Sequence, residues 1–334
     1  MNGDLWLDVR PIQRLRQPLM THPRKILFVS AALVLLALGC AVTKKTVHLA
    51  NGERDTPWAP IDSLSSIGQY ASALKATDAV LARAQAAHDW RTEFRAWMYA
   101  VRFQRLTGIE DEVVIAQMDS AANASETPLK QLLHSVVAEE WWNYYQNNRW
   151  KVLDRTNMAE ATDDPQTWDQ ATFMRKVIAE YAASLEPSAA LEKIPVGELG
   201  PLLLVQKSDT AFRPTLFDVL AHRALEVFEN SETRLSEPAW RFQLESPKAF
   251  ALPQEFVAAD FSTRDSSAWE WQDLRIYQRL TALHLADGRP AALTDVTMDR
   301  LKFAFWATTL ADRDSLYLHA LEAFSATLSV GEEQ

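Results

Sequence analysis

Residues 94–108 read FRAWMYAVRFQRLTG. Apolar side chains recur here every three or four positions along two neighbouring lines, one starting at Phe94 and the other at Tyr99. This period is typical of an α-helix, and a helix that is apolar over most of its girth has to lie between neighbours. Gly108 follows the last apolar residue, as glycine does at the C-terminal cap of a helix. The segment therefore predicts an inner helix of a packed helical array.

The same period continues through most of residues 61–328. Further helices are expected near residues 67–84, 129–145, 167–185, 214–227, 267–287, 296–308 and 315–327. Asn147 and Asn148 are predicted to stop the second of these, and a capping box at Thr167 is predicted to open the third. Residues 231–261 are richer in proline and lack a clear period, which predicts an irregular connector with short strands or turns. Residues 68–74, GQYASAL, are similar to the second helix of a tetratricopeptide repeat, in which the glycine permits a close approach of the paired helix. We predict an all-α fold, an irregular tetratricopeptide-like array of helical hairpins (an α-solenoid).

The N-terminal region indicates how the chain reaches a membrane. Residues 26–38 are apolar or small apart from Ser30, and at 13 residues they are short for a membrane-spanning helix. A basic pair precedes them, as in a secretory signal, and residues 36–40, LALGC, resemble a bacterial lipobox. The chain's single cysteine, Cys40, is the residue that a lipobox would modify. Residues 1–40 are therefore predicted to be a signal segment with Met20 as the true start and Cys40 as the lipid attachment site.

Charge supports a lipid anchor rather than a protein surface that binds membranes. Residues 1–40 hold five basic and two acidic residues, so the rest of the chain carries 29 basic and 42 acidic residues. Such a surface is repelled by anionic lipid and by nucleic acid, which argues against a nucleic-acid partner. We expect residues 41–60 to be a flexible tether and residues 329–334 a polar tail. Ala41 after the cysteine weakly favours the outer membrane of a bacterial envelope, with the protein facing the periplasm.

A search for chemistry in the sequence finds no catalytic pattern. None of the seven histidines is four residues from another, so no helix face offers a pair of zinc ligands. His222 and His284 lie in apolar segments and are predicted to be hydrogen-bonded core or groove histidines rather than metal ligands. Neither a nucleophile-elbow motif nor a phosphate-binding loop occurs. The sequence therefore predicts no catalytic, cofactor or metal site, and a protein that is not an enzyme.

Tryptophans are unusually frequent, with 12 in the chain. Trp141, Trp142, Trp269 and Trp271 could form stacking platforms for a sugar or a peptide. Adjacent indoles on a helix point about 100° apart, so both are buried only where other helices lie on two sides. Packing inside the array is the favoured interpretation, and binding by exposed aromatic rings is the alternative.

Several short phrases occur together in a characteristic order. They are PLKQLL (128–133), QNNRW (146–150), DRT (154–156), DPQTW (164–168), RPTLFD (213–218), LAHRAL (220–225) and SEPAWRF (236–242). In this order, behind a lipobox, they resemble the helical N-terminal region of the long bacterial alpha-2-macroglobulin family lipoproteins. The resemblance covers roughly residues 61–327.

The resemblance implies an envelope-anchored protease trap, an endopeptidase inhibitor. In that family a protease cuts a bait segment, and β-sandwich domains then close around it. Some members also bond the protease through a Cys–Gln thioester. These 334 residues contain no recognisable bait or β-sandwich series and no cysteine after Cys40. We therefore expect a scaffold or docking part, a fragment of a trap, with proteases or envelope proteins as partners. The alternative is a stand-alone helical lipoprotein that binds glycan or peptide.

Overall fold

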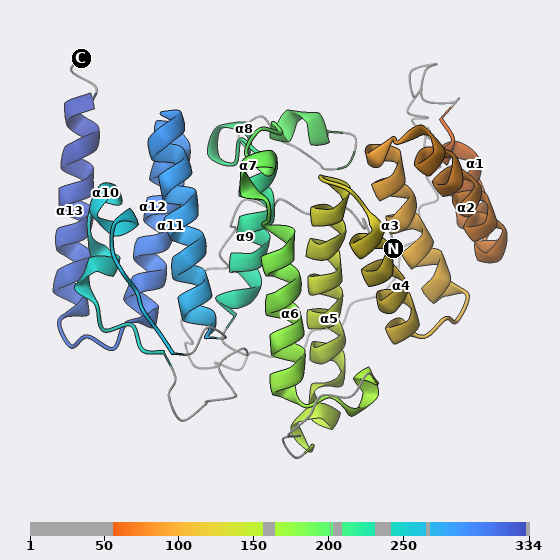
Figure 1. Ribbon diagram of the computed structural model, residues 1–334, viewed down its shortest axis with the longest axis horizontal. Helices are drawn as coiled ribbons and strands as arrows, with labels where there is room; N and C mark the ends of the chain where they lie inside the picture. The colour runs from red at the N-terminus through yellow and green to blue at the C-terminus, as the bar shows by residue number, and fades with distance from the viewer. Residues whose placement is uncertain are drawn as a thin grey trace, which may run out of the picture.

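The computed structural model describes residues 56–155, 164–200, 202, 209–230, 242–264 and 268–331. In this part of the chain the regular structure is helical, and β pairing is limited to the isolated bridges Pro195–Thr215 and Leu244–Thr308. The predicted all-α class is thus confirmed. Figure 1 shows the helices following one another across the molecule, from α1 and α2 at one end to α13 at the other. None of the described helices is both long enough and apolar enough to cross a lipid bilayer.

The longer helices pair mainly with their neighbours in sequence, as in a hairpin array. They are α1 (Trp58–Ser66), α2 (Tyr70–Ala87), α3 (Trp90–Leu106), α4 (Asp111–Ala124), α5 (Leu129–Leu153), α6 (Gln170–Ser184), α9 (Leu216–Phe228), α11 (Trp269–Asp287), α12 (Pro290–Ala307) and α13 (Arg313–Gly331). Shorter pieces connect them: η1 (Pro165–Thr167), α7 (Ser188–Leu191), η2 (Val196–Leu199), α8 (Asp209–Phe212), η4 (Pro247–Phe250) and α10 (Pro253–Val257).

Helix α3 lies between two hydrophobic cores, as its sequence predicts. Phe94 and Val101 belong to the main core, which extends along the array as far as α13. Tyr99 and Phe103 belong to a smaller core that α3 shares with α1 and α2. Gly108 follows α3 with a φ of +87°, a left-handed conformation that costs glycine little. The helix is therefore apolar on two faces because it buries both.

Helices α5, α6 and α9 form what we call the central unit. Helix α5 packs closely against α6 and also contacts α3, α4 and α9. Its residues are buried on nearly every side over its first half, from Leu129 to Ala138. Arg223 of α9 joins the unit by donating hydrogen bonds to Ser135 Oγ at 3.0 Å and Glu139 Oε2 at 2.6 Å. Helix α5 is therefore the centre of the array, because other helices surround it.

Several predicted boundaries are wrong by a few residues. Helix α5 does not stop at residues 147–148 but continues to Leu153. The cap of α6 is Asp169, whose side chain accepts from the Thr172 backbone N–H, whereas Thr167 ends the short helix η1. Asparagines are tolerated inside a helix that is held by tertiary packing, so they are weak stop signals.

The predicted domain limits also shift at both ends. Residues 58–60, assigned to the tether, begin α1, and residues 329–331, assigned to the tail, end α13. The predicted connector contains the helical pieces η4 and α10 rather than strands, while residues 231–241 lie outside the described residues.

Gly68 does not play the part that the tetratricopeptide resemblance assigned to it. It lies in the turn between α1 and α2 with a φ of +76°. A Cβ placed on it would meet no atom within 4 Å, so it does not permit a close approach of two helices. The glycine is needed for the left-handed backbone of the turn.

Candidate functional site

The predicted lipid attachment site, Cys40, lies outside the described residues, as does the whole signal segment. The other candidates can be placed. They are the four tryptophans and the histidines of the apolar helices, together with the carboxylates that the fold brings to them.

Trp141, Trp142 and Trp269 are packed inside the array. Their exposed fractions are 3%, 6% and 7%. The ring of Trp141 lies 4.9 Å from that of Trp168, and the ring of Trp142 lies 6.0 Å from that of Trp269. Buried aromatic pairs at such separations stabilise a core. These three rings are therefore core residues, and no sugar or peptide can stack on them in this conformation.

Trp271 is half-buried and packs at the edge of the main core. Its Nε1–H donates to the backbone carbonyl oxygen of Phe261 at 2.6 Å. That bond fixes the segment before α11 to the helix, so Trp271 also has a structural role.

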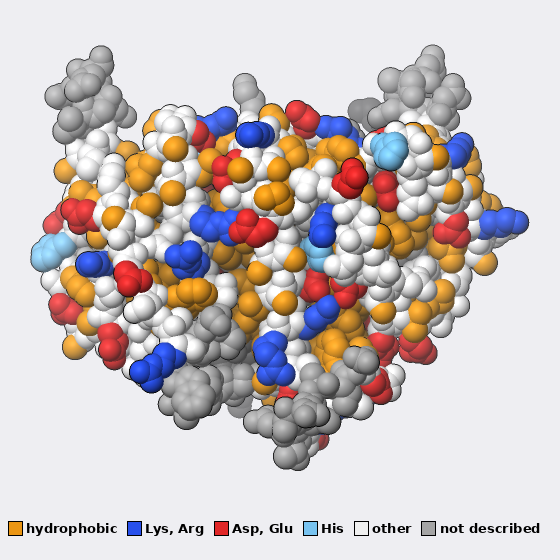
Figure 2. All heavy atoms as spheres, viewed as in Figure 1, with side chains coloured by type: hydrophobic (Ala, Val, Ile, Leu, Met, Phe, Trp, Pro, Cys, Tyr) orange, Lys and Arg blue, Asp and Glu red, His pale blue; other side chains and the backbone are white. Residues whose placement is uncertain are grey.

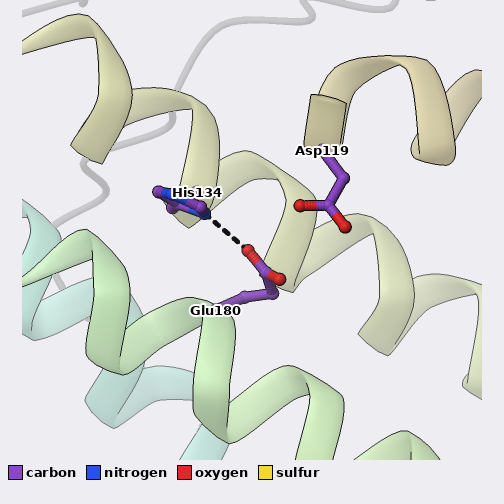
Figure 3. A group of neighbouring side chains, drawn as sticks. All are labelled: Asp119, His134 and Glu180. Carbon is purple, nitrogen blue, oxygen red and sulfur yellow. Dashed lines mark hydrogen bonds and ion pairs between the residues drawn. The ribbon is translucent and has the colours of Figure 1, made fainter. Parts of the chain in front are cut away.

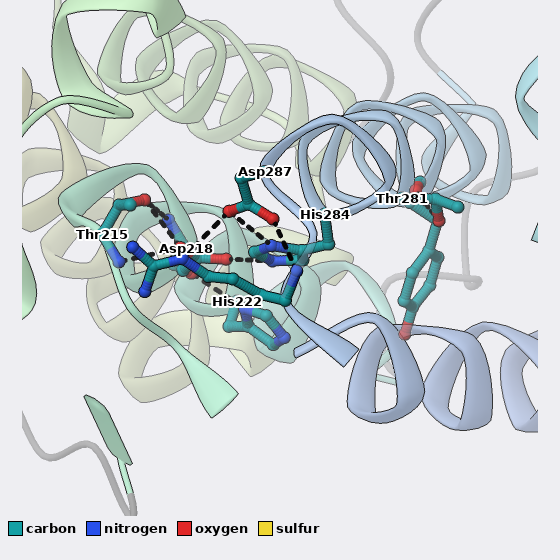
Figure 4. A network of polar contacts seen from close by, with 8 residues as sticks. Thr215, Asp218, His222, Thr281, His284 and Asp287 are labelled. Atoms are coloured by element: carbon teal, nitrogen blue, oxygen red, sulfur yellow. Dashed lines mark hydrogen bonds and ion pairs between the residues drawn. The ribbon is translucent and has the colours of Figure 1, made fainter. Parts of the chain in front are cut away.

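A buried polar network joins the start of α9 to the end of α11 (Figure 4). Thr215 caps α9, and Asp218 completes a capping box by accepting from the Thr215 backbone N–H at 2.9 Å. The other carboxylate oxygen of Asp218 lies 2.8 Å from His284 Nε2. His284 Nδ1 lies 3.3 Å from Asp287 Oδ2. Both nitrogens of His284 have partners, as the sequence predicts for a core histidine.

The charge of His284 follows from these partners. Burial by itself would lower the pKa of His284, but the hydrogen bond and negative charge of Asp218, helped by Asp287, raise it. The network is thus a charge-compensated link between two helices, with no free reactive group.

His222 lies one turn after Asp218 on α9 and is 8% exposed. Its Nδ1 is 2.8 Å from the backbone carbonyl oxygen of Asp218, whereas its buried Nε2 has no hydrogen-bond partner. Burial and the positive charge of Arg213 lower the pKa of His222 to about 4, so the ring is neutral at pH 7. The prediction of a fully hydrogen-bonded histidine is therefore correct for His284 and wrong for one nitrogen of His222.

Two carboxylates of α12, Asp295 and Asp299, face this ring. One atom of each and one ring nitrogen of His222 lie within 4.8 Å of one another. Burial and the negative charge of Asp299 raise the pKa of Asp295. A neutral imidazole beside two carboxylates is a set of groups that can bind a metal ion.

A second group of this kind is made by Asp119 of α4, His134 of α5 and Glu180 of α6 (Figure 3). His134 Nδ1 lies 2.6 Å from Glu180 Oε2. The ammonium of Lys176 lies 2.8 Å from both Asp119 Oδ2 and Glu180 Oε1. The fold therefore already supplies a cation to these carboxylates.

Sequence reasoning missed both groups. A search within single helices looks for ligands four residues apart, but His222 and Asp295 come from helices separated by α11 in the chain. The one local sign was the spacing of Asp295 and Asp299, which are four residues apart and so share a face of α12.

On the face shown in Figure 2, acidic and basic side chains are interspersed among apolar ones. No family model, no curated protein and no solved structure matches this chain.

Proposed function

We propose that this chain is the helical scaffold module of a membrane-anchored alpha-2-macroglobulin-like protease trap. In this role it holds the trapping machinery at a fixed distance from the membrane and takes no part in the reaction. The observation that carries the proposal is the ordered set of phrases described above, which continues for most of the chain behind a lipobox.

The phrases within the described residues occupy related places in the fold. Two of them lie at the two ends of α5, one forms η1 and the approach to α6, and two form the start and the body of α9. They therefore belong to the central unit and its junctions.

The continuous packing of the array also supports a role as a scaffold. The main hydrophobic core is continuous from Phe94 on α3 to Ala320 on α13. Close-packed interiors are hard to deform, so an array with one uninterrupted core transmits position well. A module that sets a distance needs this property.

These 334 residues hold no cysteine after Cys40, so they do not themselves supply the cysteine of a thioester. The glycan-binding alternative rested on exposed tryptophans, and Trp141, Trp142 and Trp269 are buried. We therefore propose no second function.

The test begins with the DNA that follows codon 334. A continuous or frameshifted reading frame that encodes β-sandwich domains supports the proposal, and an unrelated gene contradicts it. The second step measures the rate at which trypsin digests a large protein substrate and a small peptide substrate. Both rates are measured in the presence of the purified full chain in detergent.

We expect the chain alone to leave both trypsin rates unchanged. Joined to its β-sandwich continuation, it should slow digestion of the large substrate and spare the small one, because a closed trap excludes only large molecules. Slower digestion of the large substrate by the chain alone would show that the trapping parts have been misidentified.

A further inference from the structure

We propose that His222, Asp295 and Asp299 form a binding site for a divalent transition-metal ion, best suited to Zn²⁺, that links α9 to α12. The inference is independent of the protease-trap proposal.

The free nitrogen of His222 is the first observation. A carbonyl oxygen can only accept a hydrogen bond, so Nδ1 carries the proton that is donated to Asp218. Nε2 is then the unprotonated nitrogen and keeps its lone pair. Metal-binding histidines characteristically donate their other N–H to a backbone carbonyl or a carboxylate, which orients the ring. His222 already has this second partner.

The buried position of that lone pair is costly without a ligand. Nε2 is shielded from solvent and has no hydrogen-bond partner. A buried polar atom without a hydrogen-bond partner destabilises the folded state. A metal ion coordinated by Nε2 would remove this penalty.

The two carboxylates supply the remaining protein ligands. Among the described residues, Asp295 has no ion-pair or hydrogen-bond partner, and Asp299 is held by Lys302 at 3.0 Å through Oδ1 alone. A carboxylate has two oxygens, so Asp299 can keep Lys302 and still offer its second oxygen to a metal. Two negative charges balance a divalent cation. The positive charge of Arg213, which acts on both His222 and Asp295, keeps the site from being strongly acidic.

The spacing suits a small ion. Zinc bonds to nitrogen and oxygen are about 2.0–2.2 Å long, so neighbouring ligand atoms of a tetrahedral site lie about 3.4 Å apart. The three atoms here lie within 4.8 Å of one another. Zinc binding would therefore require the two aspartate side chains on α12 to bring their carboxylate oxygens closer to the ring nitrogen. Three protein ligands leave the fourth position to water, as is usual in open zinc sites.

The group at Asp119, His134 and Glu180 provides a matched comparison. Its three ligand atoms also lie within 4.8 Å of one another and its residue types are almost the same, yet the ammonium of Lys176 lies 2.8 Å from both of its carboxylates. Its histidine nitrogen Nδ1 is also paired with Glu180. In the second group Lys302 pairs with Asp299 through one carboxylate oxygen, and no ion pair to Asp295 is found among the described residues. The ligand atoms of the first group are therefore already paired, whereas Asp295 and His222 Nε2 in the second group are not.

The choice of ion follows from the ligands. Imidazole nitrogen favours zinc and other late first-row metals, whereas calcium and magnesium prefer all-oxygen sites. Because the ligands come from α9 and α12, which are separated in the chain by α11, binding would cross-link the C-terminal part of the array to the central unit.

The experiment uses the full chain in detergent after treatment with EDTA and removal of the chelator. Zinc is titrated in competition with a chromophoric chelator at pH 7.5, and the melting temperature is recorded with and without zinc. We expect one tight zinc ion per chain and a higher melting temperature when it is bound. Calcium and magnesium at the same concentration should produce neither effect.

Asp295→Asn is the principal variant because it keeps the shape of the side chain. It should weaken zinc binding at least tenfold and abolish the zinc-dependent rise in melting temperature. The metal-free variant should melt no lower than the wild type, because the amide relieves the repulsion between Asp295 and Asp299. The second variant, His222→Gln, is tested with Co²⁺ in place of zinc. The visible spectrum of its bound Co²⁺ should lack the contribution of an imidazole ligand.

The matched control is Asp119→Asn, in the group that holds Lys176, and it should leave zinc affinity unchanged. Binding to any other group in the chain, including Cys40, would persist in Asp295→Asn. The proposal is overturned if the wild type binds no zinc, or if Asp295→Asn binds it within twofold of the wild type.

Discussion

The carboxylate of Asp218 links helix α9 to helix α11 through its contact with His284. Its Oδ2 accepts hydrogen bonds from the backbone and hydroxyl of Thr215 at the start of α9, and its Oδ1 lies 2.8 Å from His284 Nε2 near the end of α11. The two side chains are 0% and 1% exposed. A local helix cap is thereby extended into a tertiary contact between segments 66 residues apart.

This relationship makes the free energy of unfolding depend on pH. The pKa of His284 is raised in the folded protein above its ordinary value of about 6.5, so the folded state holds its proton more tightly than the unfolded chain. The stabilisation is complete below about pH 6.5 and is lost as the pH rises through the folded pKa. Replacing His284 with Gln should lower the free energy of unfolding by about 3 kcal/mol at pH 6, because Asp218 then lacks its charged partner.

Urea unfolding followed by circular dichroism between pH 6 and pH 9 measures this effect. The difference in unfolding free energy between wild type and His284→Gln should shrink as the pH rises. The exposed His319 provides the control, and His319→Gln should retain the wild-type pH dependence. A difference that stays constant across this range would contradict a charged His284.

A second prediction compares Asp218 with an ordinary capping residue. Asp89 caps α3 by accepting from the Thr92 backbone N–H at the surface. Asp89→Ala should cost about 1 kcal/mol, the usual value of an N-terminal cap. Asp218→Ala should cost about 3 kcal/mol or more, because it also leaves Nε2 of the buried His284 without its carboxylate partner. Equal costs in urea unfolding would mean that the contact with His284 contributes nothing.

A third prediction concerns the tryptophans. Trp141→Ala should lower the free energy of unfolding by about 3–5 kcal/mol, because it leaves a large cavity beside Trp168 and Phe173. Trp150 lies on the same helix but is 71% exposed, so Trp150→Ala should change it by no more than about 0.5 kcal/mol. A similar small loss in both variants would show that Trp141 is not packed as the structure has it.

A fourth prediction tests the membrane anchor. If Cys40 is processed at a lipobox, the mature chain begins at Cys40 and carries acyl chains that hold it in the membrane fraction. Mass spectrometry of the N-terminal peptide should detect the modified cysteine. Cys40→Ala should accumulate as the unprocessed precursor, whereas Thr43→Ala, three residues away, should be processed normally. An unmodified Cys40 in the mature protein would exclude lipidation.

The sequence predicted the fold class well and the limits of its elements less well. The apolar lines through residues 94–108 placed α3 between two layers of neighbours, and the structure has it there. The stop predicted at residues 147–148 is wrong, because α5 continues to Leu153 with Val152 of its last turn buried in the main core. The tetratricopeptide-like role of Gly68 also failed, since local similarity says little about which surfaces meet.

What the sequence by itself determined is the helical character of the array, because an apolar period of 3.6 residues is a local property of the chain. What only the tertiary structure decided is which polar groups meet inside it. Asp218 reaches His284, and His222 faces Asp295 and Asp299, across helices that come together only after packing. These contacts depend on how distant segments pack, and the spacing of residues along one helix does not contain that information.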